Sequence, residues 1–121
     1  MAEKNYILVE NESIESSDLS TFVFSEKQQG SGYNKKTGGL HTAQFELDQF
    51  KGSIKLQGTL DLYPGDLSWS DISYTSGSDL TALDSTALTT NETRNFLGNW
   101  VWIRAGYVLE QGTIVKIRYT F

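Results

Sequence analysis

The sequence lacks cysteine altogether, holds one proline and one histidine, and contains no long apolar run. Without cysteine there are no disulfide bonds and no thiolate metal sites, so packing and hydrogen bonds must stabilise the fold. Every apolar run is shorter than the roughly 18 residues that a membrane-spanning helix needs. The first residues lack the basic and then apolar stretches of a secretion signal. We therefore expect a protein made in the cytoplasm, with no membrane partner.

Positive charge is scarce as well. Ten Lys and Arg residues stand against 15 Asp and Glu residues, for a net charge of -5, and the basic residues are scattered apart from the pair Lys35-Lys36. A net negative charge opposes binding to phosphate backbones. We expect no nucleic-acid partner, and we interpret the acidity as a means of keeping the protein soluble.

Residues suited to catalysis or metal binding are few. A Ser-His-Asp triad would have to use His41, yet no serine lies in a Gly-x-Ser-x-Gly turn. Several aspartates offer carboxylates for acid–base catalysis or for calcium, but their spacing matches neither pattern. They are Asp61, Asp66, Asp71, Asp79 and Asp84. We interpret them as solvated loop acids, with calcium binding as the alternative, and predict no enzyme activity, no catalytic residue, no metal site and no cofactor.

The length of 121 residues is typical of one compact domain, so we expect a single domain over residues 1–121. No segment shows sustained 3.6-residue periodicity with caps, which argues against a helical domain. Two-residue alternation dominates instead. Near the C-terminal end Val115, Ile117, Tyr119 and Phe121 alternate with polar residues, which predicts a half-buried strand.

A second alternating segment, residues 99–107, has large side chains on both faces. One face holds Val101, Ile103 and Ala105, and the other holds Trp100, Trp102 and Arg104. We expect this strand to be central, and we predict that the short connection 108–112, which ends in glycine, is a hairpin to the C-terminal strand. The face of the two tryptophans must be covered by a loop, a second sheet or another subunit.

Further strands are expected earlier in the chain. Residues 54–62 alternate apolar and polar side chains, with Gly58 on the apolar face, where we expect a bulge or a close neighbouring backbone. The turn Pro64-Gly65-Asp66 follows, and residues 69–74 resume an extended pattern.

The first half is less regular. Short strands are expected at residues 6–9, 21–24 and 41–47, with Phe22/Phe24 and Phe45/Leu47 as candidate core pairs. Residues 28–39 contain four glycines and predict a flexible Gly-rich loop. Residues 76–92 form a long Ser/Thr/Asp-rich connection that holds either a short helical turn over residues 79–83 or an irregular crossing between sheets.

Seven or eight short strands in a chain of this length predict an all-β fold, namely a two-sheet antiparallel β-sandwich of Greek-key or jelly-roll type. The aromatic residues are numerous enough to fill such a core and still leave rings exposed for binding. The candidate binding residues are Trp69, Trp100, Trp102, Arg104 and Tyr74.

Four segments of the second half carry a family pattern. They are residues 50–60 (Phe-Lys-Gly-Ser-Ile-Lys-Leu-Gln-Gly-Thr-Leu), Pro64 with the later Trp69-Ser-Asp-Ile72, residues 95–105 (Asn-Phe-Leu-Gly-Asn-Trp-Val-Trp-Ile-Arg-Ala) and residues 111–117 (Gln-Gly-Thr-Ile-Val-Lys-Ile). Over residues 50–121 the chain thereby resembles β-sandwich modules in virion structural proteins of tailed bacteriophages, notably those that infect cyanobacteria. The long connection 76–92 departs from the family pattern.

The resemblance implies a non-enzymatic structural or assembly protein of the virion, made in the host cytoplasm and placed in the tail, baseplate, fibre or capsid surface. We expect other virion proteins as partners and a symmetric homo-oligomer, in which weak contacts are repeated around an axis. The alternative is a carbohydrate-binding module that stacks host-surface glycans on exposed aromatic rings. An enzyme is the third and weakest interpretation.

Overall fold

The structure is a computed structural model, and it describes residues 5–13, 22–33, 39–75, 77–81 and 87–121. These residues form strands and turns with no helix, which confirms the predicted all-β class. Eight strands make one open antiparallel sheet. They are β1 (Asn5–Ser13), β2 (Val23–Phe24), β3 (Gln28–Gln29), β4 (Leu40–Thr59), β5 (Ser70–Asp71), β6 (Leu80–Thr81), β7 (Leu88–Leu97) and β8 (Trp102–Thr120).

Two strands, β4 and β8, are far longer than the short strands predicted from the sequence. They contain 20 and 19 residues. They pair antiparallel from Thr42 opposite Thr120 at one end to Thr59 opposite Trp102 at the other. β1 and β7 flank the first end, which we call the β1/β7 half, and the four short strands flank the second end, the β3/β5 half. The two halves of the sheet therefore share the same central strands.

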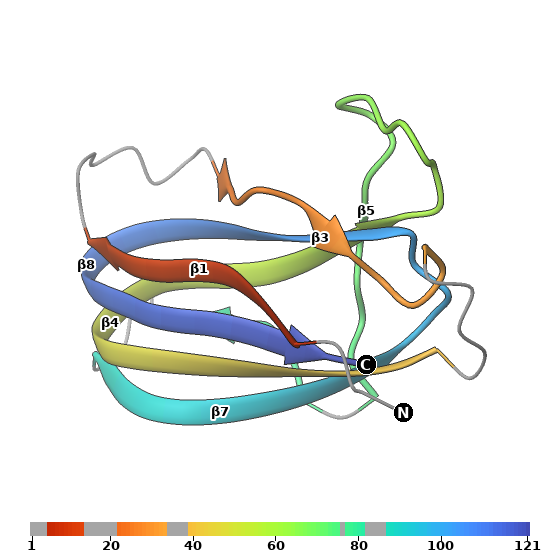
Figure 1. The fold of residues 1–121 in the computed structure, drawn as a ribbon. Coiled ribbons are helices and arrows are strands. Elements are labelled where there is room, and N and C mark those ends of the chain that lie inside the picture. Colours follow the sequence, from red (N-terminus) through yellow and green to blue (C-terminus); the bar gives the residue numbers. More distant parts are fainter. Residues whose placement is uncertain (1–4, 14–21, 34–38, 76, 82–86) are drawn as a thin grey trace.

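Both long strands turn back at the left-hand end of Figure 1. The ladder shifts register between Asp48 and Gly52 of β4, and Gln49 between them has a left-handed φ of 52°. Gly112 of β8 has a φ of 84°, and a Cβ there would lie 2.1 Å from the carbonyl oxygen of Gln49. Bulges of this kind bend a strand and increase its twist. The predicted hairpin at residues 108–112 is therefore wrong, because these residues stay within β8 and the glycine serves the bend.

The bend makes the two halves face each other across one hydrophobic core (Figure 1). Ile117 from the β1/β7 half and Ile103 from the β3/β5 half are both fully buried in it. Phe45 and Leu47 are buried as well, which confirms this predicted core pair. The alternation read from the sequence thus places most inner side chains of the two long strands correctly. Val115 is the exception: it is only partly buried, and Ile114 lies in the core in its place.

Two other segments predicted to be buried lie at the surface. Phe24 is 40 % exposed and Phe22 is half-buried, because the two-residue strand β2 places their rings on the outer side of the sheet. Leu60 and Leu62 are 68 % and 51 % exposed, because β4 ends at Thr59 and the alternation has no neighbouring strand beyond it.

A crossing segment leads from the β3/β5 half to the β1/β7 half, seen in green below the β5 label in Figure 1. Near its start the backbone N–H of Ile72 donates to the carbonyl of Leu56 at 2.9 Å, and further on the N–H of Thr75 donates to the carbonyl of Asn95 at 2.8 Å. These contacts lie before residues 76–92, so the irregular crossing expected within that stretch stays a prediction. Residues 80–81 form β6 instead of a helical turn, and residues 76 and 82–86 lie outside the described part.

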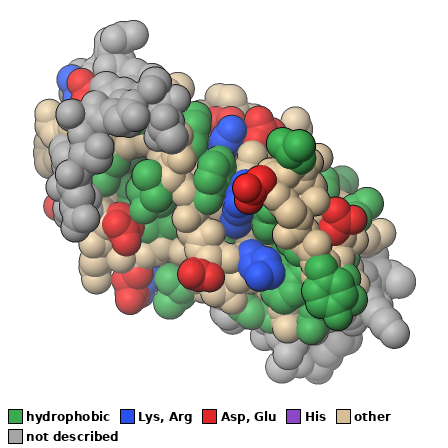
Figure 2. Space-filling model, turned by 90° about the horizontal axis from the view of Figure 1, so that it is seen from above, with side chains coloured by type: hydrophobic (Ala, Val, Ile, Leu, Met, Phe, Trp, Pro, Cys, Tyr) green, Lys and Arg blue, Asp and Glu red, His purple; other side chains and the backbone are tan. Residues whose placement is uncertain are grey.

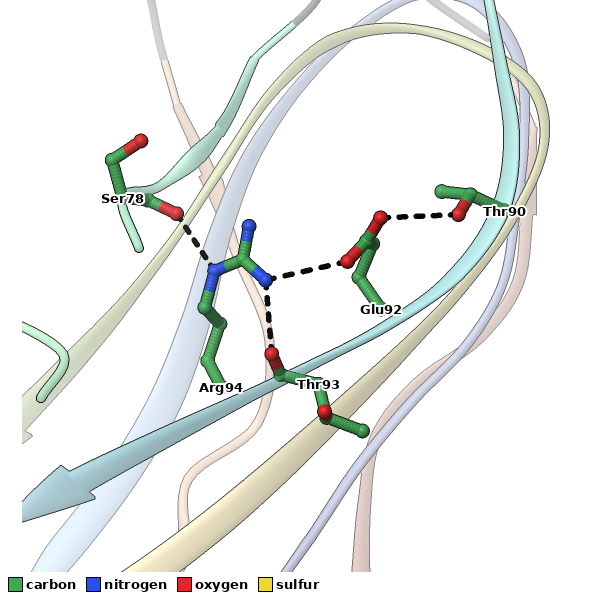
Figure 3. A network of polar contacts seen from close by, with 5 residues as sticks. All are labelled: Ser78, Thr90, Glu92, Thr93 and Arg94. Carbon is green, nitrogen blue, oxygen red and sulfur yellow. Dashed lines mark hydrogen bonds and ion pairs between the residues drawn. The ribbon is translucent and has the colours of Figure 1, made fainter. Parts of the chain in front are cut away.

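Arg94 of β7 fastens this crossing segment to the sheet (Figure 3). Its Nε donates to the carbonyl of Ser78 at 3.0 Å and its Nη1 donates to the carbonyl of Thr93 at 2.9 Å. Glu92 lies 3.5 Å from the same Nη1 and accepts a hydrogen bond from Thr90. Arg94 thus occupies the outward carbonyl of Thr93, and the N–H of Thr75 occupies that of Asn95. A further strand would need both carbonyls to pair with this edge of β7.

The described part of the predicted flexible loop 28–39 makes several contacts with the rest of the fold. Its first two residues form β3 and pair with β8. The N–H of Ser31 donates to Nε2 of His41 at 3.3 Å, and Nδ1 of this fully buried imidazole lies 3.0 Å from the carbonyl of Gly39. Residues 34–38 lie outside the described residues.

Candidate functional site

The outer surface of the β3/β5 half carries aromatic side chains among positive charges. We call it the aromatic face, and its rings belong to Phe22, Phe24, Tyr33, Tyr63, Trp69 and Trp102. Figure 2 looks onto this side of the molecule and shows hydrophobic and basic side chains next to one another, with carboxylates around them. Exposed apolar groups gathered in this way mark binding or assembly surfaces in soluble proteins.

Trp102, the first residue of β8, forms the floor of an open hollow of about 500 Å³. Its indole N–H donates to the carbonyl of Leu62 at 2.9 Å, which holds the loop after β4 against the ring. The ring of Tyr33 lies 4.9 Å from that of Trp102, and Lys27 places its ammonium 5.0 Å from the indole. Tyr63, which is 90 % exposed, completes the wall. The volume lies within the range of about 300–1,000 Å³ that ligand pockets occupy.

Arg104, two residues along the same strand, is clamped between two rings. Its guanidinium carbon lies 3.9 Å from the centroid of Phe24 and 4.3 Å from that of Trp69. Its Nε donates to Oε1 of Gln57 at 2.9 Å. Phe24 can approach because Gly106 has no side chain, and a Cβ there would lie 2.7 Å from the phenyl ring. These contacts fix the orientation of the guanidinium.

Gln57 links this arginine to an acid. Its Nε2 donates to Oδ1 of Asp71 at 2.9 Å, and Lys55 lies 3.3 Å from the same oxygen. The hydrogen bond from Gln57 holds the pKa of Asp71 below its usual value, with help from Lys55 and against the effect of burial. Burial lowers the pKa of Arg104, while Asp66 opposes this. The guanidinium stays charged in any case, because arginine does not deprotonate in proteins.

A second hollow of about 250 Å³ lies in front of Arg104. Lys27 and Pro64 line both hollows, so the two adjoin. Glu26 and Asp66 bring carboxylates to the second one. The first hollow is therefore mainly aromatic, and the second presents charges of both signs.

The structure brings three of the five predicted binding residues together, namely Trp69, Trp102 and Arg104. Tyr74 is not among them. It lies half-buried in the crossing segment, where its ring packs against the core and burial raises the pKa of its hydroxyl far above the usual value.

Trp100 is not on this face either, and the prediction that it shares a side with Trp102 is wrong. The ladder of β8 starts only at Trp102, and before it the indole of Trp100 packs against the core and over Gly58. A Cβ at Gly58 would lie 2.5 Å from this indole, so the glycine makes room for a ring and not for a neighbouring backbone. The indole N–H of Trp100 is buried with no hydrogen-bond partner among the described residues.

Sequence reasoning missed Lys27, Phe24, Tyr33 and Tyr63 as parts of the face. Phe24 was expected in the core because it alternates with Phe22, and Tyr33 was expected in a flexible loop. The sequence does carry a signal: the alternation of Phe22 and Phe24 is short and is followed at once by the polar residues 25–29, which is too little to predict a buried strand.

Other kinds of site find little support in the described residues. His41 is buried in the core, with its ring 4.7 Å from that of Phe96 and stacked on it. No group of three or more His, Asp or Glu side chains within the described ranges could hold a metal ion. A helix long and apolar enough to cross a membrane is likewise not found in them.

Comparisons with known protein families, with curated proteins and with solved structures find no match to this chain. The resemblance to phage virion modules accordingly stays a prediction from the sequence. The function has to be argued from the aromatic face itself.

Proposed function

We propose that this chain is a non-enzymatic binding and assembly component of a tailed-phage virion, and that the aromatic face is its contact surface. One observation carries the proposal: rings and cations are gathered on the outside of one half of the sheet, where Tyr63 is 90 % and Phe24 40 % exposed. Aromatic residues and arginine are the side chains most enriched at the centres of protein interfaces. The tail, baseplate, fibre and capsid surface all remain compatible with this role.

The edges of the sheet at β7 and β1 are poorly suited to pairing with a strand of another chain, which favours contact through the aromatic face. Arg94 and Thr75 occupy the outward carbonyls of Thr93 and Asn95 on β7. Asn11 of β1 has a left-handed φ of 53°, a kink that does not suit pairing with another strand. A symmetric homo-oligomer or a ring of other virion proteins would then repeat a side-chain contact around an axis.

We also propose that the fold is a two-sheet sandwich. The two halves of the bent sheet enclose one core, as the layers of a two-sheet sandwich of Greek-key or jelly-roll type do. What supports this description is the shared core. The halves are joined through β4 and β8 instead of through loops.

The test is to search purified virions for the chain by mass spectrometry, to locate it by electron microscopy, and to measure its oligomeric state by light scattering. Trp102→Ala should weaken self-association or incorporation while the circular dichroism spectrum stays that of a β protein. Thr93→Ala, exposed on β7 away from the face, is the control and should change neither. A strict monomer at high concentration that is absent from particles would overturn the proposal.

A second candidate function is carbohydrate binding, favoured by the hollow over Trp102. Three aromatic rings, those of Tyr33, Tyr63 and Trp102, line an open space of ligand size. Aromatic rings stack on the apolar face of a sugar ring while polar neighbours bind its hydroxyls. A glycan array should give a signal that Trp102→Ala or Trp69→Ala removes without loss of folding. An array without any signal would leave assembly as the function of the face.

A further inference from the structure

Arg104 has unused hydrogen-bonding capacity in a fixed position. The rings of Phe24 and Trp69 lie 3.9 and 4.3 Å from its guanidinium carbon, and its Nε donates to Gln57. Neither Nη group makes a hydrogen bond to another residue that the structure describes. The side chain lines the second hollow, so the free edge of the guanidinium borders open space. A guanidinium fork held in this way matches the two oxygens of a carboxylate.

Lys27 adds a second cation at the junction of the two hollows. Its ammonium lies over the ring of Trp102, and no carboxylate is within ion-pair distance of it among the described residues. A cationic ligand is disfavoured on this ring, because the ammonium of Lys27, 5.0 Å from the centre of the indole ring, would repel a second positive charge. The charge available to a ligand at this junction is therefore positive.

The distance between Trp102 and Arg104 allows a single ligand molecule to occupy both hollows. Trp102 and Arg104 are alternate residues of β8 and point to the same side, which separates them by about 7 Å along the strand. A ring placed on Trp102 can therefore carry a substituent that reaches Arg104. Glu26 and Asp66 line the second hollow too, and their oxygens can accept hydrogen bonds from hydroxyl groups. These carboxylates and the net charge of -5 repel a polyphosphate chain, with its several negative charges, more strongly than a ligand with a single carboxylate beside Arg104 and Lys27.

We infer that the two hollows form one site for a carboxylate-bearing saccharide, such as a uronic-acid oligosaccharide. Its sugar ring stacks on Trp102 beside Tyr33 and Tyr63, and its carboxylate binds the Nη edge of Arg104 and the ammonium of Lys27. The inference rests on the carbohydrate-binding candidate above and does not require the virion role.

The experiment is calorimetric titration of the whole chain with a panel of uronic-acid oligosaccharides, each measured beside its methyl ester. The ester keeps the sugar ring and removes the charge. The acid should bind at least about tenfold more tightly than its ester, because a charge-assisted pair is lost in the ester. Arg104→Gln and Lys27→Gln should each weaken binding of the acid by roughly tenfold and weaken binding of the ester much less, so that each variant narrows the difference between acid and ester. Trp102→Ala should abolish binding of both.

Lys51→Gln is the matched control, because it removes the same charge about 20 Å away along β4 from the residue opposite Arg104. Equal binding of acids and esters, unaffected by Arg104→Gln, would overturn the inference and leave the carbohydrate candidate standing. A loss in Lys51→Gln as large as in Arg104→Gln would also overturn it, because binding would then follow overall charge. If no member of the panel binds, the inference and the carbohydrate candidate both fail, while the virion role keeps its own test.

Discussion

The same two strands, β4 and β8, contribute to the outer surfaces of both halves of the sheet, yet the arginines on the two surfaces have different partners. On the β1/β7 half, Arg118 pairs with Glu46 on the neighbouring strand. On the β3/β5 half, Arg104 lies between the rings of Phe24 and Trp69. An ion pair uses the donors of its cation, whereas a cation clamped by rings keeps donors for another molecule. The Nη2 of Arg118 is thus used within the sheet, whereas the Nη groups of Arg104 have no hydrogen-bond partner among the described residues and suit that surface to binding.

The flanking strands create this difference. On one side β1 supplies Glu10, which lies 3.3 Å from Lys116 of β8. On the other side β2 supplies Phe24, whose ring fits over Gly106 of β8. β4 and β8 therefore provide the frame, and the short edge strands decide what each surface can do.

The largest effect should come from removing the bend that separates the two surfaces. Gly112→Ala places a Cβ 2.1 Å from the carbonyl oxygen of Gln49, at a φ of 84° that disfavours any side chain. We expect the free energy of unfolding to fall by about 3 kcal/mol or more, measured by urea denaturation. Gly65→Ala is the matched control, since the nearest atom to its Cβ would be 4.0 Å away. Equal stability of the two variants would mean that the bend forms without glycine.

A somewhat smaller effect is expected at His41, which connects the two regions. The imidazole packs on Phe96 inside the β1/β7 half and accepts a hydrogen bond from Ser31, two residues before Tyr33 of the aromatic face. His41→Ala should cost about 2–4 kcal/mol, because it leaves a cavity and an unpaired backbone N–H. Thr42→Ala, the adjacent residue on the outer side, should cost far less. A loss below about 1 kcal/mol for His41→Ala would show that the loop is held by other contacts.

Much of the fold could be predicted from the sequence, because burial follows two-residue alternation. His41, Ala43, Phe45 and Leu47 are buried as that pattern predicts, and so are Ile117, Tyr119 and Phe121. Val115 is only partly buried, because the register with β4 shifts at that point and Ile114 lies in the core instead. The hairpin at residues 108–112 could not be distinguished from a bend, since both use a glycine with positive φ, and only the register with β4 decides between them. A long bent strand and two short strands with a turn have the same local pattern.

The site could be predicted less well. Trp102 and Arg104 were found because alternate residues of a strand share a face. Trp100 was misplaced, since alternation fails before the ladder begins. Tyr33 and Lys27 come from segments whose position depends on backbone contacts with β8, and such long-range contacts leave no periodic pattern in the sequence.

Tyr119 and Tyr74 should give an effect of intermediate size when the pH is raised. Burial raises the pKa of Tyr119 in the β1/β7 half and of Tyr74 in the crossing segment well above the usual 10.0. In the unfolded chain they ionise near pH 10, so their contribution is present below pH 10 and is lost above it. Each should remove about 1.4 kcal/mol per pH unit above that point. Urea denaturation from pH 8 to 12 should give a shallower decline for Tyr119→Phe and the shallowest for the double variant with Tyr74→Phe. An unchanged slope would contradict burial of these hydroxyls.

The smallest expected effect is a difference in coupling energy between the ion-paired Arg118 and Arg104, which contacts aromatic rings. A double-mutant cycle on Arg118 and Glu46, both partly exposed, should give a coupling energy of about 0.5 kcal/mol that nearly vanishes in high salt, because salt screens exposed charges. The equivalent cycle on Arg104 and Phe24 should give a coupling of about 0.5–1 kcal/mol that salt changes little, since ring and guanidinium are in direct contact at 3.9 Å. Replacement by glutamine for charged residues and by leucine for the phenylalanine keeps the side-chain volumes similar. If salt reduced both couplings alike, Arg104 would be an ordinary surface charge, and the contrast between the two surfaces would lose its physical basis.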